Sequence, residues 1–416
     1  MTLISRLLAG RRRLASDARE LALEAPDPGT PRPGLVQLGW TLPAPLPGGW
    51  LTVSAKGVAP SRVALPPTES SGLIVLHGHL LDDGRHRVGV EAFDADGRRV
   101  ARAERELAFS NPGALGEAVR RSLRARGTPF AVAVCDAALY DYADESIQPW
   151  FDRPDADATI AAWAAEGRIA AAEAEALRCF VRDGYVRLQG AIEPDLVRAV
   201  NAEIDDAVGR KWQGYQWGSS QRIEHLHEHY AAIRKLWLHE RVMRMLALIF
   251  QARPLPCQTL TYVFGSQQDA HQDTIHLTPF PAGYMCGVWV ALEDVQPDSG
   301  ELMVWTGSHR LPRVRLHETG CAKVEGDWSE FGARVLPVWR RMIEEGRFET
   351  MLYRPKAGDV LIWHENLMHA GTPRLDPNRS RRSIVSHVFA EGALAYYDST
   401  GKPGYMEPLP ARAKAA

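Results

Sequence analysis

The second half of this chain is divided into short apolar segments that glycine and proline residues separate. The segments lie at residues 257–265, 287–295, 300–309, 358–371 and 382–390. Strands of this length, joined by turns, are typical of two sheets packed as a barrel rather than of a parallel α/β sheet. We therefore expect a mainly β fold with helices, built around a double-sheet barrel.

The N-terminal part of the chain has a different texture and predicts a second domain. Residues 25–48 are rich in proline and glycine, and residues 50–109 read as strands with a hairpin turn at Asp96-Gly97. A chain of 416 residues is also long for one domain. We predict an N-terminal helix and linker over 1–35, a smaller β-sandwich-like accessory domain over 36–150, and the barrel domain over 151–405.

The composition excludes some classes of function. A formal net charge of −2 gives no reason to expect nucleic acid as a partner. No apolar run reaches the roughly 18 residues that a membrane-spanning helix needs. Five cysteines without a C-x-x-C pair favour a reducing cytoplasm. The apolar residues before Arg11 predict a helix that caps its own protein or a partner, or that lies on a membrane surface.

His271-Gln272-Asp273, followed by His369 and Arg382, is the motif that indicates a chemistry. Two imidazoles and one carboxylate form the facial ligand set of ferrous iron and leave coordination positions open. Residues two apart on a strand face the same side, so His271 and Asp273 can grip one ion. The guanidinium of Arg382 suits the far carboxylate of a bidentate acid. Because one H-x-D triplet is expected by chance in a chain with 14 histidines, the flanking sequence must support the site.

Other histidines offer rival metal sites. Alternate histidines at residues 225–229 lie in a segment that reads as an amphipathic helix, on which they point apart and cannot share an ion. His364 and His369 form H-E-x-x-x-H, one residue longer than the zinc-protease motif and flanked by strands. The H-G-H at residues 77–79 lies on a predicted strand without a third ligand. We therefore interpret residues 225–229 as a solvated helix face and the histidines at 77–79 as packed or solvated, and we reject the zinc-protease interpretation of residues 364–369.

The flanking sequence resembles the phytanoyl-CoA dioxygenase family of iron(II)/2-oxoglutarate oxygenases. Five motifs match in order over residues 172–392: FVRDGYVRLQGAIEPDLV, HQD, WVALED with SGELMVWTGSHR, GDVLIWHENLMHAGTP and RSIVSHVFA. The resemblance implies a double-stranded β-helix (jelly-roll, cupin-like) oxygenase core. T-G-S-H replaces the family's P-G-S-H, and residues 1–165 have no counterpart in the family's minimal fold.

The resemblance also implies a role for each residue that matches a family motif. Fe(II) would be bound by the catalytic residues His271, Asp273 and His369. Arg382 would anchor the distal carboxylate of the cosubstrate 2-oxoglutarate, with Arg381 as the adjacent alternative. Dioxygen would be the second cosubstrate. The retained Asp273 favours hydroxylation, since related halogenases lack this carboxylate.

Further positions of the motifs would line the cosubstrate and substrate pockets. Gln272 and Trp289 match positions beside the cosubstrate. The residues after the first ligands would line the mouth of the barrel and contact substrate: Thr274, His276, Phe280 and Tyr284. Residues 313–353 interrupt the core strands with a short helix, and we interpret them as a lid, or else as a surface decoration.

The implied reaction hydroxylates an unactivated C–H of a small molecule and releases succinate and CO₂. A carrier-linked molecule, a lipid, a glycan and a secondary metabolite are all compatible with the sequence. The N-terminal β domain would bind a protein, glycan or carrier partner. An alternative of another class is a non-catalytic binding protein with a degenerate metal site, in which the N-terminal β domain is the functional module.

Overall fold

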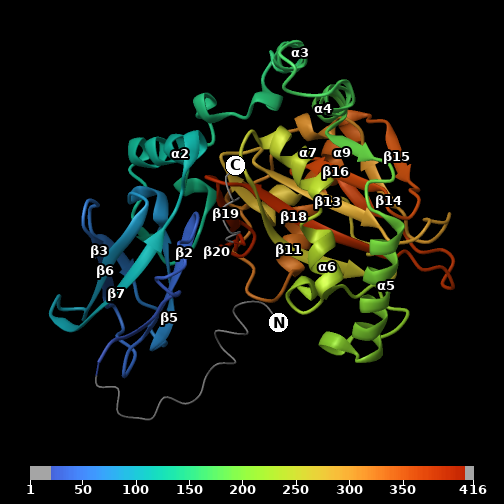
Figure 1. Cartoon of the computed structure of the whole chain (residues 1–416). Coiled ribbons are helices and arrows are strands. Elements are labelled where there is room, and N and C mark those ends of the chain that lie inside the picture. The colour runs from blue at the N-terminus through green and yellow to red at the C-terminus, as the bar shows by residue number, and fades with distance from the viewer. Residues whose placement is uncertain (1–19, 408–416) are drawn as a thin grey trace. The chain divides into compact units, whose positions relative to one another are not determined.

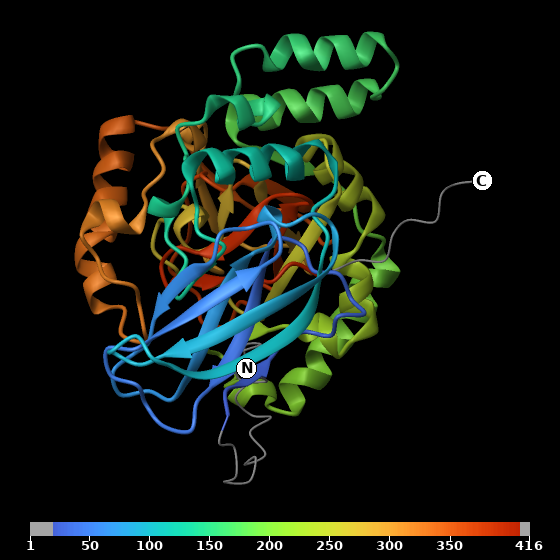
Figure 2. The same cartoon turned by 90° about the vertical axis from the view of Figure 1, so that its left-hand side faces the viewer.

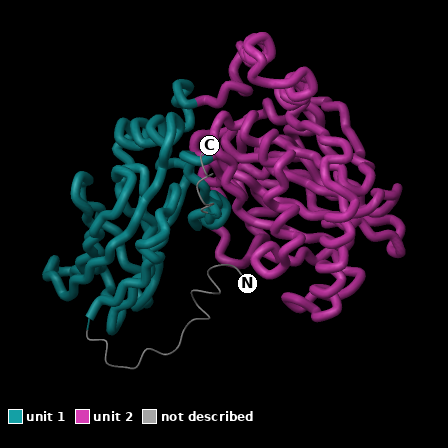
Figure 3. The backbone as a smooth tube through the Cα atoms, viewed as in Figure 1, with its two compact units in different colours: residues 1–147, 391–416 teal, residues 148–390 magenta. Residues whose placement is uncertain are grey.

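The structure, a computed structural model, describes residues 20–407 and divides the chain into two compact units (Figure 3). Of these residues, the first unit comprises 20–147 and 391–407, and the second comprises Gln148–Ala390. Residues 391–405, which we expected in the barrel domain, therefore pack in the first unit instead. The helix predicted at the start of the chain lies outside the described residues.

The first unit contains two four-stranded antiparallel sheets (Figure 2). Alternate side chains are fully buried, such as Leu38 and Ile74 in one sheet and Leu51 and Val90 in the other, as in the inner faces of a sandwich. The predicted β-sandwich is confirmed. The first sheet is ordered β1 (Ala22–Glu24), β2 (Leu35–Thr41), β5 (Ser71–His77), β8 (Ala131–Val132), and the second β4 (Ser61–Ala64), β3 (Trp50–Ala55), β6 (Gly84–Phe93), β7 (Arg99–Phe109).

The C-terminal strands β19 (Leu394–Tyr397) and β20 (Lys402–Pro403) belong to this first unit. The backbone N–H of Cys135 donates to the carbonyl of Gly401 at 2.8 Å, and the N–H of Ala137 donates to Asp398 Oδ1 at 3.1 Å. Helix α2 (Gly113–Arg126) lies between β7 and β8 in the chain. Segments that lie far apart in the sequence, before residue 148 and after residue 390, thus pack together in the first unit.

The H-G-H motif lies in the core of the first unit. His77 ends β5, whereas His79 belongs to a 3₁₀ turn, so the two rings do not share a strand face. His77 Nε2 is 3.0 Å from the hydroxyl of Tyr140, and His79 Nε2 is 2.7 Å from the carbonyl of Gly392. Both imidazoles are fully buried and hydrogen-bonded within the unit, which gives them a structural role.

A six-stranded antiparallel sheet forms the larger wall of the second unit (Figure 1). The predicted segment 382–390 forms its central strand, since β18 pairs with both β11 and β13. In order across the sheet the strands are β10 (Ile223–Glu224), β11 (Pro254–Tyr262), β18 (Ser383–Ala390), β13 (Met285–Ala291), β16 (Val360–His364) and β9 (Tyr185–Leu188).

The smaller wall contains β15 (Thr350–Tyr353), β14 (Leu302–Trp305) and β17 (His369–Gly371). One apolar core joins the walls, with Trp289 and Leu361 from the larger sheet and Val304 and Tyr353 from the smaller one. This core fills the barrel interior, and its members Trp363 and Leu367 also contact the metal motif. The predicted double-stranded β-helix is confirmed.

Helices flank the larger wall. Helix α4 (Ala171–Asp183) packs beside β9, α7 (Glu240–Phe250) packs beside β11, and α5 (Pro194–Gly209) packs against α6 (Ala231–Trp237). Helix α3 (Ala156–Ala165) packs against α4. Among residues 20–407, no helix combines the length and the apolar character needed to cross a membrane.

The predicted insertion contains α8 (Ser329–Arg334) and α9 (Leu336–Gly346), which are orange in Figure 2. Its C-terminal end differs from the expectation, because residues 350–353 form β15 of the smaller sheet. The insertion, defined here as residues 313–349, has an apolar core of its own. Phe331 and Trp339 pack there with Ile275 and Met368, which flank the metal motif on either side.

Candidate metal centre and cosubstrate pocket

His271 and His369 face each other where two segments of the second unit meet. Each backbone N–H donates to the carbonyl of the other residue, at 3.0 and 3.1 Å, and the ring centroids are 4.2 Å apart. Asp273 begins a 3₁₀ turn, and its Oδ1 lies 3.5 Å from His271 Nε2 and 3.7 Å from His369 Nε2. The three ligand atoms lie within 4.8 Å of one another. The structure therefore brings the predicted iron ligands together.

Backbone carbonyls orient both imidazoles. His271 Nδ1 lies 2.8 Å from the carbonyl of Asp269, and His369 Nδ1 lies 3.0 Å from the carbonyl of Leu367. A carbonyl can only accept, so each Nδ1 carries the proton and each Nε2 keeps its lone pair. Burial also lowers the pKa of His369 to about 4, which keeps its ring neutral. This is the tautomer and orientation that a metal-binding histidine needs.

The carboxylate of Asp273 is held from the opposite side. The indole N–H of Trp363 donates to Asp273 Oδ2 at 2.8 Å, which leaves Oδ1 directed at the two histidines. Burial alone would raise the pKa of Asp273. The surrounding histidines outweigh it and hold the pKa well below its usual value, so the group is a carboxylate.

A further histidine, which the sequence analysis did not single out, lies beside the triad. His387 Nε2 is 3.6 Å from Asp273 Oδ2, and His387 Nδ1 is 3.1 Å from the side-chain nitrogen of Gln258. Both residues lie on paired strands of the larger sheet, β18 and β11. The period of two along a strand was the available signal, because His387 shares the parity of the inward-facing Val385.

The structure corrects the choice of arginine. Arg382 points out of the barrel, where its guanidinium binds Asn201 and Asp205 of α5 at 3.3 and 2.7 Å. Arg381 points inward and is 2% exposed, with NH1 donating to the carbonyl of Gly300 at 2.8 Å. Adjacent residues at the start of a strand face opposite sides, so only one of the pair can reach the interior. Arg381, the alternative in the sequence analysis, is that residue.

Arg381 stands among other polar groups that lack partners. Its guanidinium carbon lies 5.6 Å from the centre of the Trp289 ring. Arg381 Nε, Trp289 Nε1 and Ser383 Oγ are buried and make no hydrogen bond within the described residues. No ion pair joins Arg381 to a carboxylate in residues 20–407. A buried guanidinium without a carboxylate is costly, so these groups form a site made for an anion.

Gln272 does not face this pocket, contrary to the expectation. Its Nε2 donates to the carbonyl of Pro312 at 3.1 Å, and its Oε1 accepts from the N–H groups of Val314 and Trp339 at 3.3 and 3.1 Å. The side chain therefore binds the insertion. Trp289, by contrast, does lie beside Arg381, as the resemblance implied.

His276 joins an aromatic cluster that the insertion supplies. Its ring centroid lies 5.7 Å from that of Trp328, 5.2 Å from that of Phe331 and 6.2 Å from those of Trp339 and the ligand His271. Burial lowers the pKa of His276 to about 3, so its ring is neutral. His276 thus lies beside the predicted iron ligand His271, and its contact with substrate stays a prediction.

The other predicted substrate residues lie in different surroundings. The backbone N–H of Thr274 donates to the carbonyl of Glu365 at 3.1 Å. Phe280 is fully buried in β12 (Thr278–Phe280). Burial raises the pKa of Tyr284 to about 12, and charges on Arg153 and Asp152 act on its hydroxyl. Their contact with substrate stays a prediction.

The structure also corrects the reason for setting aside the histidines at 225–229. This segment is not a helix: β10 ends at Glu224, His225 has φ of 59°, and α6 begins only at Ala231. Ligand atoms of His225, His227 and Glu228 lie within 4.8 Å of one another. His227 Nδ1 forms a hydrogen bond with Thr259 Oγ1 at 2.8 Å, and the ring centroids of His227 and Trp237 are 3.8 Å apart. Thr259 lies on β11 between Gln258 and Leu260, whose side chains face the barrel interior. The side chain of Thr259 therefore points to the outer face of the larger sheet, and this histidine group lies outside the barrel.

The chain is similar to a known protein family and to several solved structures. The family model described as phytanoyl-CoA dioxygenase matches residues 180–383. The comparison with curated proteins gave no match. The chain is similar to the crystal structure of the epimerase SnoN in complex with Fe³⁺, alpha ketoglutarate and nogalamycin RO, at 18% identity and a TM-score of 0.44, over 58% of this chain and 97% of that one.

Two further solved structures are similar over a comparable share of the chain. They are the carbocyclase SnoK from nogalamycin biosynthesis, at 20% identity and a TM-score of 0.46, over 59% of this chain and 96% of that one, and EctD from S. alaskensis with bound Fe, at 20% identity and a TM-score of 0.42, over 53% of this chain and 77% of that one. The family assignment rests on the match of the family model, which covers about half of the chain. Residues 180–383, which contain the whole metal motif, belong to the phytanoyl-CoA dioxygenase family.

Proposed function

We propose that the second unit is an Fe(II)/2-oxoglutarate-dependent dioxygenase that hydroxylates an unactivated C–H of a small molecule. The observation that carries the proposal is the set of His271, Asp273 and His369. Both imidazoles direct Nε2 toward the same carboxylate oxygen, and both keep Nδ1 bonded to a backbone carbonyl. A facial set of two histidines and one carboxylate is typical of non-haem iron oxygenases.

The described residues fit both the metal and the cosubstrate. Iron would be held by His271, Asp273 and His369. The distal carboxylate of 2-oxoglutarate would be held by Arg381, whose Nε has no partner among the described residues. Ser383, two residues later and on the same face of the strand, has a hydroxyl that is likewise unpaired within these residues and could also donate to it. When bound, the iron and the 2-oxo acid supply the oxygen activation that no protein side chain can perform.

The chain itself contributes orientation and the exclusion of water. Trp363 fixes which oxygen of Asp273 faces the histidines. The apolar core around Trp289, Leu361 and Leu367 lies next to the arginine and keeps this part of the barrel dry. In such surroundings an Arg–carboxylate pair is stronger than in water, and it fixes the cosubstrate in one orientation.

The substrate would approach on the side that the insertion covers. His276 and the rings of Trp328 and Phe331 lie there, and Trp328 is 45% exposed. Two of the similar structures are an epimerase and a carbocyclase. Stereochemical inversion and ring closure are therefore outcomes that product analysis must distinguish from hydroxylation.

The test is an anaerobic titration of the full-length protein with Fe(II) and 2-oxoglutarate, followed by the visible charge-transfer absorption of the iron–2-oxo acid chelate. We expect a band in the wild type and none in His369→Ala. Oxygen added to the loaded wild type should then yield succinate. Absence of both the band and succinate in the wild type would favour the non-catalytic binding protein with a degenerate site.

A further inference from the structure

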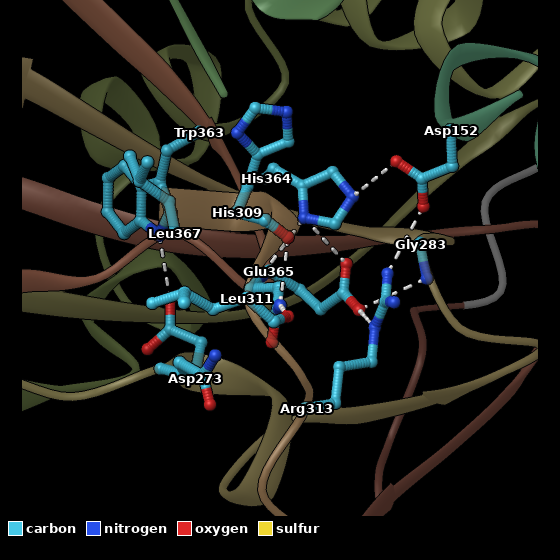
Figure 4. A network of polar contacts seen from close by, with 12 residues as sticks. Asp152, Asp273, Gly283, His309, Leu311, Arg313, Trp363, His364, Glu365 and Leu367 are labelled. Atoms are coloured by element: carbon cyan, nitrogen blue, oxygen red, sulfur yellow. Dashed lines mark hydrogen bonds and ion pairs between the residues drawn. The ribbon is translucent and has the colours of Figure 1, made fainter. Parts of the chain in front are cut away.

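A buried charged network lies beside the metal centre and has no part in the proposed chemistry (Figure 4). Arg313 Nε donates to Glu365 Oε1 at 2.7 Å, and Arg313 NH2 donates to Asp152 Oδ2 at 3.2 Å. The imidazole of His364 lies between the two carboxylates, with Nε2 3.3 Å from Asp152 Oδ1 and Nδ1 3.2 Å from Glu365 Oε2. The N–H of Gly283 also donates to Glu365 Oε1, at 3.1 Å.

These charges are held where solvent does not reach them freely. The side chain of Glu365 is 0% exposed, and that of Asp152 is 16% exposed. Burial acts to raise the pKa of Asp152, but its neighbours His364 and Arg313 outweigh burial and hold the pKa well below its usual value. Buried ion networks contribute little net stability compared with apolar packing, whereas loss of one partner is strongly destabilising. Stability alone therefore gives a weak reason for this network.

Glu365 lies in the short segment that leads from β16 to the iron ligand His369. Every residue near it makes a contact that fixes the segment. Trp363 bonds to Asp273, the carbonyl of Glu365 accepts from the N–H of Thr274, and the carbonyl of Leu367 orients the ligand imidazole. The network thus holds the middle of the segment that positions His369.

Arg313 is the first residue of the insertion, and the insertion begins on the iron motif. Gln272, between the first two ligands, binds the carbonyl of Pro312 and the N–H of Val314, the two neighbours of Arg313. The side chain of Asn366 donates to the carbonyl of Leu311 at 2.6 Å. The start of the insertion is therefore tied to both parts of the metal motif.

We infer that Arg313 is a positioning residue for the oxygenase site: through Glu365 and Asp152 it fixes the segment that carries His369 relative to the start of the insertion. The inference rests on the proposed function for its catalytic consequence. Its structural part, the placement of a metal ligand, does not need turnover. On this inference the insertion is a fixed segment beside the metal centre, and it does not move as a lid about residue 313.

The experiment uses the full-length protein with the variants Arg313→Met, Arg313→Lys and Glu365→Gln. Arg334→Met is the matched control, because Arg334 lies in α8 of the same insertion, is half exposed, and pairs only with its helix neighbour Glu330 among the contacts described here. Two quantities are measured for each: the affinity for Co(II), from its visible absorption, and kcat and KM for 2-oxoglutarate in succinate formation without added substrate.

We expect Arg313→Met and Glu365→Gln to weaken Co(II) binding at least fivefold and to lower kcat about tenfold. The KM for 2-oxoglutarate, which Arg381 determines, should change less than twofold. Arg313→Lys keeps the charge but loses the forked geometry, so it should recover part of both losses. The control should match the wild type. If Arg313→Met does not fold, the other two variants carry the test.

Co(II) affinity and kcat equal to wild type in folded Arg313→Met or Glu365→Gln, with a loss of thermal stability alone, would overturn the inference. Wild type that binds Co(II) but forms neither the iron chelate nor succinate would instead refute the proposed function. In that case a loss of Co(II) affinity in the variants still supports the positioning role. The two failures are therefore distinguishable.

Discussion

The side-chain oxygen of Gln272 accepts a hydrogen bond from the indole N–H of Trp339 at 3.1 Å, and this bond joins the residue between two metal ligands to helix α9 of the insertion. Trp339 is 1% exposed, so the bond is shielded from water. The residues of the H-x-D motif thus make two kinds of contact in this chain. The outer residues face each other and His369 in the candidate metal centre, and the middle residue bonds to the insertion.

The first prediction concerns this bond. Gln272→Ala leaves the buried N–H of Trp339 without its acceptor, and an unpaired buried donor costs roughly 1–3 kcal/mol. We expect lower thermal stability and looser packing of the insertion, with the affinity for 2-oxoglutarate unchanged. Limited proteolysis between residues 313 and 349, together with the KM for 2-oxoglutarate, checks this. A large rise in the KM for 2-oxoglutarate with unchanged proteolysis would contradict this prediction and would indicate that Gln272 lines the cosubstrate pocket.

The second prediction separates the two adjacent arginines. Arg381→Gln should weaken 2-oxoglutarate binding about a hundredfold, because the distal carboxylate loses a charge-assisted, bidentate partner in a dry pocket. Arg382→Gln should leave that affinity within twofold, since its guanidinium binds α5 outside the barrel. Titration of the iron-loaded variants with 2-oxoglutarate measures both constants. The opposite order would mean that Arg382 is the anchor after all.

The third prediction concerns Trp363. Trp363→Phe keeps most of the ring but removes the N–H that holds Asp273 Oδ2. Groups that orient a metal ligand in this way typically contribute 10–100-fold to metal affinity. We expect Fe(II) and Co(II) binding to weaken by about tenfold, with the fold intact by circular dichroism. Unchanged metal affinity would show that Asp273 is oriented by its histidine neighbours alone.

The fourth prediction is a pH dependence of the first unit. Burial lowers the pKa of His79 to about 3, whereas an unfolded histidine titrates near 6.5. Below pH 6.5 the unfolded chain therefore binds a proton that the folded chain does not, and the free energy of unfolding falls as the pH falls toward 3. At pH 5 the loss from this one group is about 2 kcal/mol.

Denaturant unfolding at pH 7 and pH 5 measures this dependence. His79→Gln should reduce the difference between the two pH values, because the amide does not titrate and can still donate to the carbonyl of Gly392. The matched control is His86→Gln, whose ring sits near the surface and bonds to the carbonyl of Asp82. An equal pH difference in wild type and His79→Gln would contradict the prediction.

The sequence indicated the fold well wherever a strand pattern is strict. The segments at 287–295 and 382–390 alternate or run apolar because both pair within one sheet, and both became strands of the larger wall. The same period of two could have selected Arg381 and His387, since both share the inward parity of Val385. The alignment of Arg382 with the family's strand did not take that parity into account.

Other features depend on contacts that no local pattern records. His225 adopts a left-handed backbone conformation, which is incompatible with the helix predicted at residues 225–229, although the residue types favour a helix. Arg313, Asp152 and Glu365 lie far apart in the sequence, and only the folded barrel brings their charges together. The orientation of the Gln272 amide likewise depends on contacts that begin at Pro312, 40 residues later.

The return of residues 391–407 to the first unit has a practical consequence for anyone dissecting this protein. The chain leaves the first unit once at 147/148 and re-enters it at 390/391, so the oxygenase is, in topological terms, a domain inserted into its own accessory domain. A fragment that covers residues 148–416 would expose Leu394 and Tyr396, which are fully buried in the structure of the whole chain. Two excisions, one at each junction, are needed to obtain the catalytic unit alone.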